Sequence, residues 1–195
     1  MNLNYLGDSM DFWKGAVFVR LQEGGILEDF AVDPMLTDAK DWHTADFHLY
    51  AGLLQIRPNQ ILRHKSTLSE YRKRYFDEIR HAGDLYVDPD TGIAPKHAGP
   101  AENYVRIGEI HKLLNSPSTR VLCVYQHVRA KKTRARVIEL FAALRELNAN
   151  IYSCSYESPN VAMLFLSLEQ NRINQMKKYF RNYLGRHSDG RVLSY

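Results

Sequence analysis

The order of apolar segments in the second half of the chain is the feature that most constrains the fold. Residues 85–87 and 121–125 are apolar or aromatic at every position, which is typical of parallel strands buried on both faces. Helical stripes separate these runs, and two further strands, 151–156 and 161–168, flank a turn at 158–160. This order predicts an α/β fold with a mostly parallel sheet and an antiparallel C-terminal hairpin.

The remaining elements follow from apolar side chains spaced three and four residues apart, or in short runs. They predict helices at 8–22, from Asp41 to about Ile56, and at 68–79, 105–114, 137–147 and 173–183, with short strands at 28–33 and 60–63. The chain has 195 residues, 45% of them hydrophobic, which suits one domain with a full core. We therefore expect residues 1–195 to form a single Rossmann-like domain, a three-layer sandwich with helices on both faces of the sheet.

Composition excludes several classes of protein. No apolar run is long enough to cross a bilayer, so no membrane association is expected. Residues 1–11 lack the basic segment and apolar core of a signal peptide. Cys123 and Cys154 lie in apolar runs and are expected to be buried free thiols, with a disulfide as the alternative; they are too few for a cysteine-rich zinc site. These features predict a cytoplasmic location.

Polar side chains end three of the expected strands. Asp33 ends the first, Asp88 and Asp90 follow the run at 85–87, and His127 follows the run at 121–125. Because the carboxyl ends of parallel strands share one crevice, we expect these side chains to converge there as a binding or catalytic centre. Carboxylates with an imidazole are also ligands for Mg²⁺ or Mn²⁺, although no local spacing supports a metal site.

Several of these residues have a plainer interpretation. Asp90 belongs to an ordinary turn in which Gly92 supplies the positive φ. His127 could simply hydrogen-bond a neighbouring loop, whereas Gln126 beside it could contact a base edge or an amide. Glu157 lies in the hairpin turn and is expected to face solvent.

A run of cations precedes and begins the helix at 137–147. Cations oppose the dipole at a helix N-terminus, and a bound phosphate of a nucleic acid or nucleotide would relieve that cost, so RNA or DNA is a candidate partner. The net charge of +4 also favours an anionic partner. The alternative is a solvated basic face, which is how a second cluster on the last helix is interpreted. The first run consists of Arg129, Lys131, Lys132, Arg134 and Arg136; the second of Lys177, Lys178, Arg181 and Arg186.

Two short motifs resemble class I methyltransferases that depend on S-adenosylmethionine (SAM). Asp88-Pro89 follows a buried strand, where amino-methyltransferases carry Asp-Pro-Pro-aromatic. Residues 7–14, Gly-Asp-Ser-Met-Asp-Phe-Trp-Lys, are similar to the Gly-Asn-x-x-Asp-x-x-Lys opening of ribosomal RNA adenine methyltransferases of the YhiR type. Within residues 7–14, a local ion pair between Asp11 and Lys14 needs no functional explanation.

The resemblance implies a SAM-binding α/β domain that acts on nucleic acid. It places Lys14, Asp33 and Asp38 at the cofactor, and Asp88, Asp90 and His127 at the reacting amine. Gln126, Arg129, Lys131 and Lys132 would hold the substrate and its phosphates. The cofactor motifs are degenerate: the loop 33–38 has no glycine, the second strand ends in His64-Lys65 rather than an acid, and Asp90-Thr91 replace the proline and aromatic ring.

Three functions from different classes therefore stay open. The first is a methyltransferase-like enzyme that uses SAM on RNA or DNA. The second is a non-catalytic module that binds nucleic acid or a partner protein through the basic run. The third is a metal-dependent phosphodiesterase or nuclease that uses Asp33, Asp88, Asp90 and His127. The fold alone does not choose between them.

Overall fold

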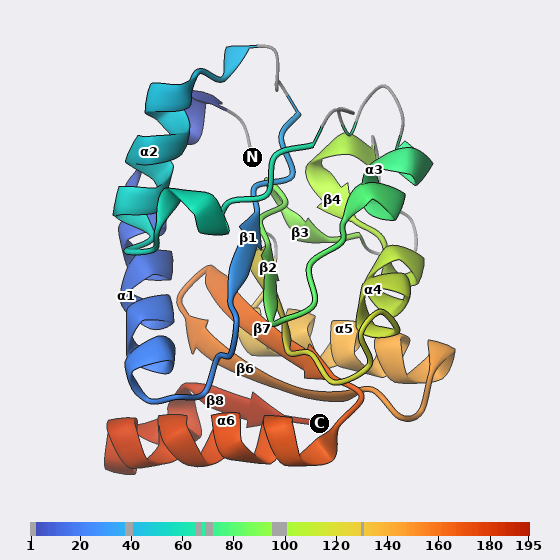
Figure 1. Ribbon diagram of the computed structural model, residues 1–195. Helices are drawn as coiled ribbons and strands as arrows, with labels where there is room; N and C mark the ends of the chain where they lie inside the picture. Colours follow the sequence, from blue (N-terminus) through green and yellow to red (C-terminus); the bar gives the residue numbers. More distant parts are fainter. Residues whose placement is uncertain (1–2, 38–40, 65–67, 69–71, 95–100, 130) are drawn as a thin grey trace.

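The chain builds one six-stranded mixed sheet. A computed structural model describes residues 3–37, 41–64, 68, 72–94, 101–129 and 131–195 (Figure 1). The strand order is β1-β2-β5-β7-β6-β8. The strands are β1 (Ala31–Asp33), β2 (Leu85–Val87), β5 (Leu122–His127), β6 (Tyr152–Ser158), β7 (Val161–Ser167) and β8 (Val192–Ser194).

The sheet has a parallel half and an antiparallel half. β1, β2 and β5 are parallel neighbours, while β7 runs antiparallel between β5 and β6, and β8 pairs antiparallel with the outer edge of β6. The predicted hairpin is confirmed, but the sheet is less parallel than predicted because β7 folds back beside β5 and β8 adds another edge. Positive φ at Asn160 closes the tight β6–β7 turn.

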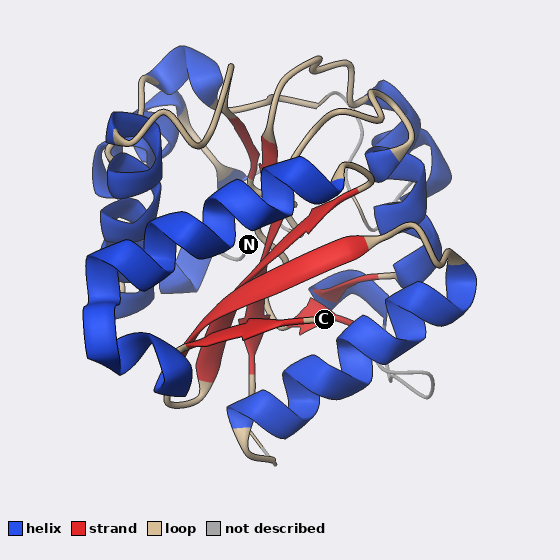
Figure 2. Cartoon of the chain, turned by 90° about the horizontal axis from the view of Figure 1, so that it is seen from below, coloured by secondary structure: helices blue, strands red, loops and turns tan. Residues whose placement is uncertain are grey.

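Helices cover both faces of this sheet, as the view from below in Figure 2 shows. We call the two sides the α1 face and the α5 face, because the side chains of α1, α2 and α6 pack into one hydrophobic cluster and those of α3, α4 and α5 into the other. The helices are α1 (Ser9–Glu23), α2 (Thr44–Leu53), α3 (Arg72–Glu78), α4 (Ile107–Leu114), α5 (Thr133–Leu147) and α6 (Gln170–Leu184). None of the described helices has the length and hydropathy needed to span a bilayer.

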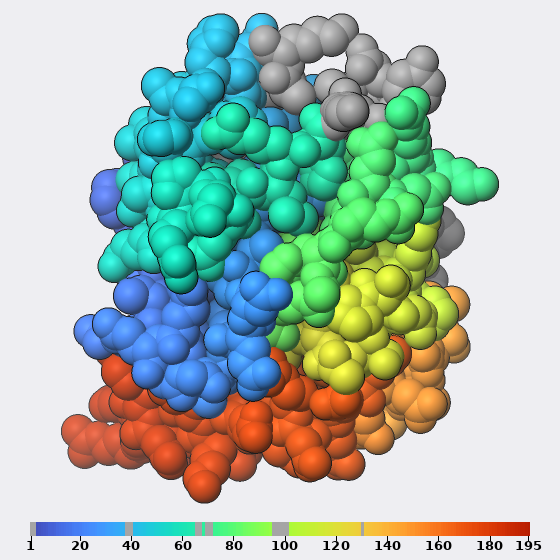
Figure 3. All heavy atoms as spheres, viewed as in Figure 1, coloured from blue at the N-terminus to red at the C-terminus, as the bar shows by residue number. Residues whose placement is uncertain are grey.

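Short elements complete the chain. A two-stranded sheet of β3 (Gly92–Ile93) and β4 (Tyr104–Val105) lies beyond the carboxyl end of β2. The 3₁₀ helices are η1 (Leu3–Tyr5), η3 (Pro58–Gln60), η4 (Ala101–Asn103) and η5 (Gly185–Gly190). In Figure 3, the orange and red C-terminal segments form the base of the molecule beneath the blue N-terminal third.

Several elements differ from those predicted, and four differences are informative. α2 begins at Thr44 rather than Asp41, because Asp46 accepts the backbone N–H of His43 and completes the first turn there. The strand expected at 60–63 is reduced to one parallel bridge between Ile61 and Val32, since η3 occupies the residues before it. Val105 belongs to β4, not to the helix after it. β8 was not predicted, because three half-buried residues at the edge of the sheet are too few to give a clear alternating pattern.

The two cysteines are buried and free, as predicted. Cys123 of β5 and Cys154 of β6 both stand opposite Phe165 of the intervening strand β7. Two strand spacings therefore separate them, about 10 Å, which is beyond the reach of a disulfide.

Gly15 sets how closely α1 approaches α2. A Cβ atom at this position would lie 2.1 Å from the carbonyl oxygen of Leu53, which is backbone and cannot rotate away. The two helices cross where only a hydrogen fits between them. This crossing fixes α1 against the sheet, and with it the polar residues at the N-terminal end of that helix.

We expect Gly15→Ala to lower the free energy of unfolding by about 1–3 kcal/mol, because the added methyl group forces the helices apart. The control is Gly52→Ala in α2, where a Cβ meets no atom within 4 Å. That change should be neutral or stabilising by up to about 1 kcal/mol, the usual gain of alanine over glycine in a helix. Urea titrations give the free energy of unfolding of both variants. Equal changes in the two variants would contradict the close crossing of α1 and α2 at Gly15.

Candidate functional site

The three polar strand ends reach one edge of the sheet but not one face. Asp33 pairs with Val87, so both point to the α5 face, and Asp88 one residue later points to the α1 face. His127 shares the α1 face, because it lies two residues after Tyr125, which packs there. The structure therefore brings Asp88 and His127 together and places the Asp33 side chain on the other side.

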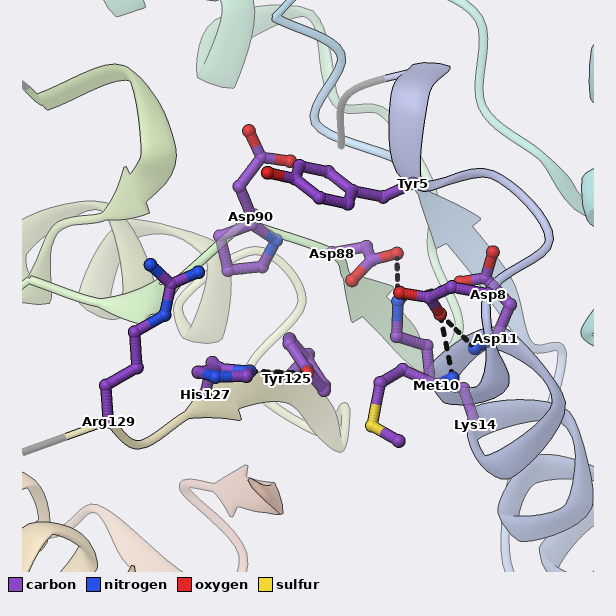
Figure 4. A pocket seen from close by; sticks show the side chains of 11 residues that line it. Tyr5, Asp8, Met10, Asp11, Lys14, Asp88, Asp90, Tyr125, His127 and Arg129 are labelled. Atoms are coloured by element: carbon purple, nitrogen blue, oxygen red, sulfur yellow. Dashed lines mark hydrogen bonds and ion pairs between the residues drawn. The ribbon is translucent and has the colours of Figure 1, made fainter. Parts of the chain in front are cut away.

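A pocket of about 120 Å³, here called the α1 pocket, lies beside Asp88 and His127 (Figure 4). The N-terminal turns of α1 form one wall, and the chain that follows β2 and the end of β5 form the others. Asp8, Asp90 and Tyr5 stand around its mouth in Figure 4. Its inner walls are made by Asp11, Lys14, Asp88, Tyr125, His127 and Arg129.

A buried ion pair between Lys14 and Asp88 forms the base of the α1 pocket. Lys14 Nζ lies 2.8 Å from Asp88 Oδ2 and 3.0 Å from Asp11 Oδ1, and the ammonium also lies over the ring of Tyr125. The side chains of Lys14 and Asp88 are only 6% and 2% exposed. The predicted Asp11–Lys14 pair is confirmed, but it is part of a triad that joins the two motifs of the sequence.

Burial and the Lys14 charge act in opposite directions on these acids. Burial by itself would raise the pKa of Asp88, but the Lys14 ammonium outweighs it and holds that pKa below the usual 3.8. For Asp11, burial outweighs Lys14 and its pKa is raised. The two carboxylates overcome the burial of Lys14 and raise its pKa. Lys14 and Asp88 are therefore both charged at neutral pH.

Two tyrosines complete the environment of Asp88. Tyr50 of α2 donates a hydrogen bond to Oδ2 at 2.5 Å, and Tyr86 of β2 donates one to Oδ1 at 2.6 Å. Burial and the negative charge of Asp88 raise the pKa of both phenols, which stay protonated as donors. Both carboxylate oxygens are thus engaged inside the protein. The alternation of β2 places Tyr86 and Asp88 on one face, so the sequence held a signal for this contact.

Asp33 has a separate, buried environment on the α5 face. Its Oδ1 accepts the backbone N–H of Met35 at 2.9 Å and the hydroxyl of Tyr75, and its Oδ2 lies 3.3 Å from His64 Nε2. Burial alone would lower the pKa of His64, but Asp33 outweighs this and raises it. Lys14 and Asp33 therefore do not share one cavity, and Asp38 lies outside the described residues. Lys14 and Asp33, the two described residues that were expected to contact SAM, lie on opposite faces of the sheet and so do not form one site for that cofactor.

No metal site is evident in the described ranges of the chain. Among these residues, no group of three histidine, cysteine or acidic side chains is close enough to hold an ion. The set proposed for Mg²⁺ or Mn²⁺ is divided, since Asp33 faces away from Asp88 and His127. The positive charge beside Asp88 is already supplied by Lys14.

A second pocket of about 520 Å³ adjoins the first and shares His127 and Arg129 with it. We call it the basic pocket, because Arg129, Lys131 and Arg136 line it against a single carboxylate, Glu139. Lys131 Nζ lies 2.6 Å from Glu139 Oε1, and Arg136 lies 3.7 Å from Oε2. The charge of the pocket lining is therefore positive by two.

Gln126, expected to contact a substrate, holds a loop in place. Its Oε1 accepts the N–H of Ile93 at 2.9 Å, and its Nε2 donates to the carbonyls of Thr91 and His127. Gly92 sits against this amide with φ 125°, as the turn interpretation predicted, and a Cβ there would overlap the Gln126 side chain. This amide forms part of the wall of the basic pocket.

His127 stands at the boundary between the two pockets. Burial and the nearby Arg129 charge lower its pKa below 6.5, so the imidazole is neutral at pH 7. Its Nδ1 lies 3.2 Å from the Tyr125 hydroxyl. A neutral imidazole beside an exposed guanidinium can hydrogen-bond a ligand without repelling Arg129.

The start of α5 faces the same region. Lys132 precedes the helix as its N-cap without a side-chain hydrogen bond to the first turn, which contains no acidic residue. Arg134 instead turns toward β6, where its Nε lies 3.1 Å from Glu157. The prediction that Glu157 faces solvent is wrong: it is 5% exposed, because Arg134 and Ser155 both hydrogen-bond its carboxylate.

Comparison of the chain with protein-family models and with curated proteins gives no match.

We expect Lys14→Met to lower the free energy of unfolding by about 3–5 kcal/mol, because it removes the ammonium that pairs with the buried Asp88 charge. The double variant Lys14→Met/Asp88→Asn should recover part of that stability, since the carboxylate charge is gone. Lys112→Met at the exposed pair with Asp77 is the control and should change little. Urea unfolding of the wild type, the two single variants and the double variant gives the coupling free energy between Lys14 and Asp88. If the effects of the two substitutions on the free energy of unfolding are additive, the ion pair is contradicted.

The His64–Asp33 pair predicts a pH dependence. The pKa of His64 is raised in the folded protein, so its contribution to stability is complete below 6.5 and is lost as the pH rises through the higher folded value. We expect His64→Gln to remove this decline, and Asp33→Asn to remove it too, whatever either change does to stability at a single pH. Unfolding free energies measured from pH 5 to pH 9 test this; an undiminished decline in either variant refutes the pairing.

Proposed function

We propose that this chain binds single-stranded nucleic acid across the carboxyl edge of its sheet, with a phosphate in the basic pocket and a base in the α1 pocket. The observation that carries this proposal is the basic pocket itself. Three cations and one carboxylate line about 520 Å³ beside the uncapped start of α5. Backbone N–H groups at a helix start, reinforced by cations, are a natural site for phosphate.

Arg129 is the central contact in this proposal. It lines both pockets, it is exposed, and no ion pair holds it within the described part of the chain. Lys131 and Arg136 share Glu139, so these three side chains together contribute one net positive charge, as much as Arg129 contributes alone. A phosphate beside Arg129 would also lie near the neutral imidazole of His127, which can donate a hydrogen bond to it.

The charge of the α1 pocket suits a different part of the same ligand. Four carboxylates, Asp8, Asp11, Asp88 and Asp90, line it against the cations Lys14 and Arg129. A second phosphate would be repelled there, whereas an uncharged ring that carries an amino group can donate to the carboxylates at the mouth. The two adjoining pockets thus match the alternation of base and phosphate along a strand.

Two features of the described chain are compatible with the methyltransferase alternative, and one speaks against it. Three parallel strands followed by an antiparallel hairpin agree with the Rossmann-like sheet of those enzymes, and Lys14 meets the Asp88-Pro89 motif. Against methyl transfer, Lys14, Tyr50 and Tyr86 already occupy the oxygens of Asp88. We therefore favour binding without catalysis, and SAM binding stays a prediction for experiment.

We expect Arg129→Glu/Lys132→Glu to weaken binding of a short oligonucleotide by about tenfold or more. The salt dependence should fall as well, by about 0.7 in log–log slope for each phosphate that the variant no longer neutralises. Arg74→Glu on α3 is a control with the same kind of charge change at an exposed site outside both pockets. Fluorescence anisotropy at several salt concentrations gives both quantities; equal weakening in the control and the double variant would refute the site.

Thermal unfolding with and without SAM tests the enzymatic alternative. A ligand present at a hundred times its dissociation constant should stabilise the fold by about 2.7 kcal/mol. Stabilisation by SAM, followed by methyl incorporation into RNA or DNA that Asp88→Asn abolishes, would replace our proposal with the methyltransferase. Stabilisation by Mn²⁺ that disappears in the same variant would favour the phosphodiesterase.

A further inference from the structure

A third pocket, of about 210 Å³, lies where the chain leaves the edge strand β1. We call it the β1 pocket. The start of the loop after β1, the helices α2 and α3, and the segment after η3 form its walls. Among the described residues, none that lines the β1 pocket also lines the α1 pocket or the basic pocket. The β1 pocket is therefore a separate site.

Most side chains on the wall of the β1 pocket are apolar. They are Pro34, Leu36, Phe47, Leu62 and Tyr75. A cavity of about 150 Å³ with apolar walls is large enough to hold benzene. The volume of the β1 pocket therefore leaves room for one such ring and a short substituent, and burial of the ring against these walls is favourable.

The loop after β1 keeps its shape without a glycine. Met35 has φ 46°, a conformation that residues other than glycine rarely adopt. Its backbone N–H donates to Asp33 at 2.9 Å, and its side chain is fully buried in the cluster of the α5 face. This turn leaves the neighbours Pro34 and Leu36, and not Met35, on the wall of the pocket.

Arg63 gives the β1 pocket a positive charge that no described acid neutralises. Its guanidinium is exposed and lies 4.4 Å from the centroid of the Phe47 ring. This contact holds the guanidinium at the pocket, but it makes no hydrogen bond or ion pair with any residue that the structure describes. Its N–H donors are therefore available to a ligand, and a planar carboxylate matches their geometry.

His64 lies beside Arg63 on the same wall. Burial would lower the pKa of His64, but Asp33 outweighs burial and raises it, which favours the imidazolium. The 3.3 Å contact to Asp33 lacks the alignment of a hydrogen bond, so the imidazole can still donate to a ligand. Glu78, the other acid that raises this pKa, pairs with Arg74. None of the described residues that line the pocket is acidic.

We propose that the β1 pocket binds a small aromatic carboxylate, with its ring against the apolar wall and its carboxylate accepting hydrogen bonds from Arg63 and His64. Arg63 would repel an amine. A neutral ring would cover the guanidinium without giving it an acceptor, which costs free energy. The inference does not depend on nucleic-acid binding, because the described residues of this pocket belong to neither of the other two.

The test uses three probes that share a phenyl ring and differ in charge: phenylacetate, phenylacetamide and 2-phenylethylamine. We expect phenylacetate to bind with a dissociation constant on the order of 1 mM or below. Phenylacetamide should bind about tenfold or more weakly, because it lacks the charge-assisted hydrogen bonds. The amine should not bind measurably. NMR titrations of the wild-type protein give the three affinities.

Two variants locate the binding site. Arg63→Gln should weaken binding of phenylacetate by about tenfold or more and leave that of phenylacetamide unchanged. Its control is Arg145→Gln, because Arg145 is also exposed and lies 5.6 Å from a ring centroid, that of Tyr195, outside the pocket. Leu62→Trp should fill the pocket and abolish binding of both probes, with urea unfolding as the check that it folds. Arg63 is exposed, so Arg63→Gln tests the site even if the larger tryptophan impairs folding.

Four results would overturn the inference. Equal affinity of the wild type for phenylacetate and phenylacetamide refutes recognition of the carboxylate. Equal weakening in Arg63→Gln and Arg145→Gln shows an effect of net charge and not of the pocket. Unchanged binding of phenylacetate by both Arg63→Gln and a folded Leu62→Trp places the ligand elsewhere. Absence of phenylacetate binding by the wild type refutes the site, and leaves the proposal of nucleic-acid binding to its own test.

Discussion

The ion pair between Lys14 and Asp88 is the contact on which the rest of the site depends. It joins the first helix to the end of β2, across 74 positions of sequence, and both side chains are almost fully buried. The attraction within a buried ion pair offsets the cost of desolvating both charges only when further hydrogen bonds satisfy the remaining polar atoms. Tyr50, Tyr86 and Asp11 form these hydrogen bonds. Because of these contacts, both carboxylate oxygens of Asp88 already have hydrogen-bond partners within the protein.

Asp88 therefore has the position of a catalytic group but a structural role. A carboxylate at the end of a buried strand in an open crevice is the usual place for a catalytic group. Here the group anchors α1, and in our proposal the ligand contacts the exposed side chains around it. The α1 pocket carries excess negative charge, the basic pocket excess positive charge, and Arg129 with His127 lies between them. The ligand we propose has negative phosphates for the basic pocket and uncharged bases for the α1 pocket.

Much of the fold was predictable from residue patterns. The fully apolar runs predicted β2 and β5, the spacing of apolar residues predicted α1, α5 and α6, and the 158–160 turn predicted the β6–β7 hairpin. Asp88 and His127 were correctly placed at one edge because parallel strands share their carboxyl ends. Asp33 was misplaced relative to them, because pairing opposite Val87 instead of Asp88 turns its side chain to the other face. A shift of one residue in register is invisible in a single sequence.

The sequence by itself determined the periodicities, the buried strands and the identities of the polar residues at their ends, because these depend on local patterns of apolar side chains. Only the tertiary structure decided which polar groups meet. The Lys14–Asp88 pair, the Tyr75 contact to Asp33 and the burial of Glu157 under Arg134 all join segments distant in sequence. Such contacts follow from strand register and helix crossing, which the chain acquires only when its elements pack together.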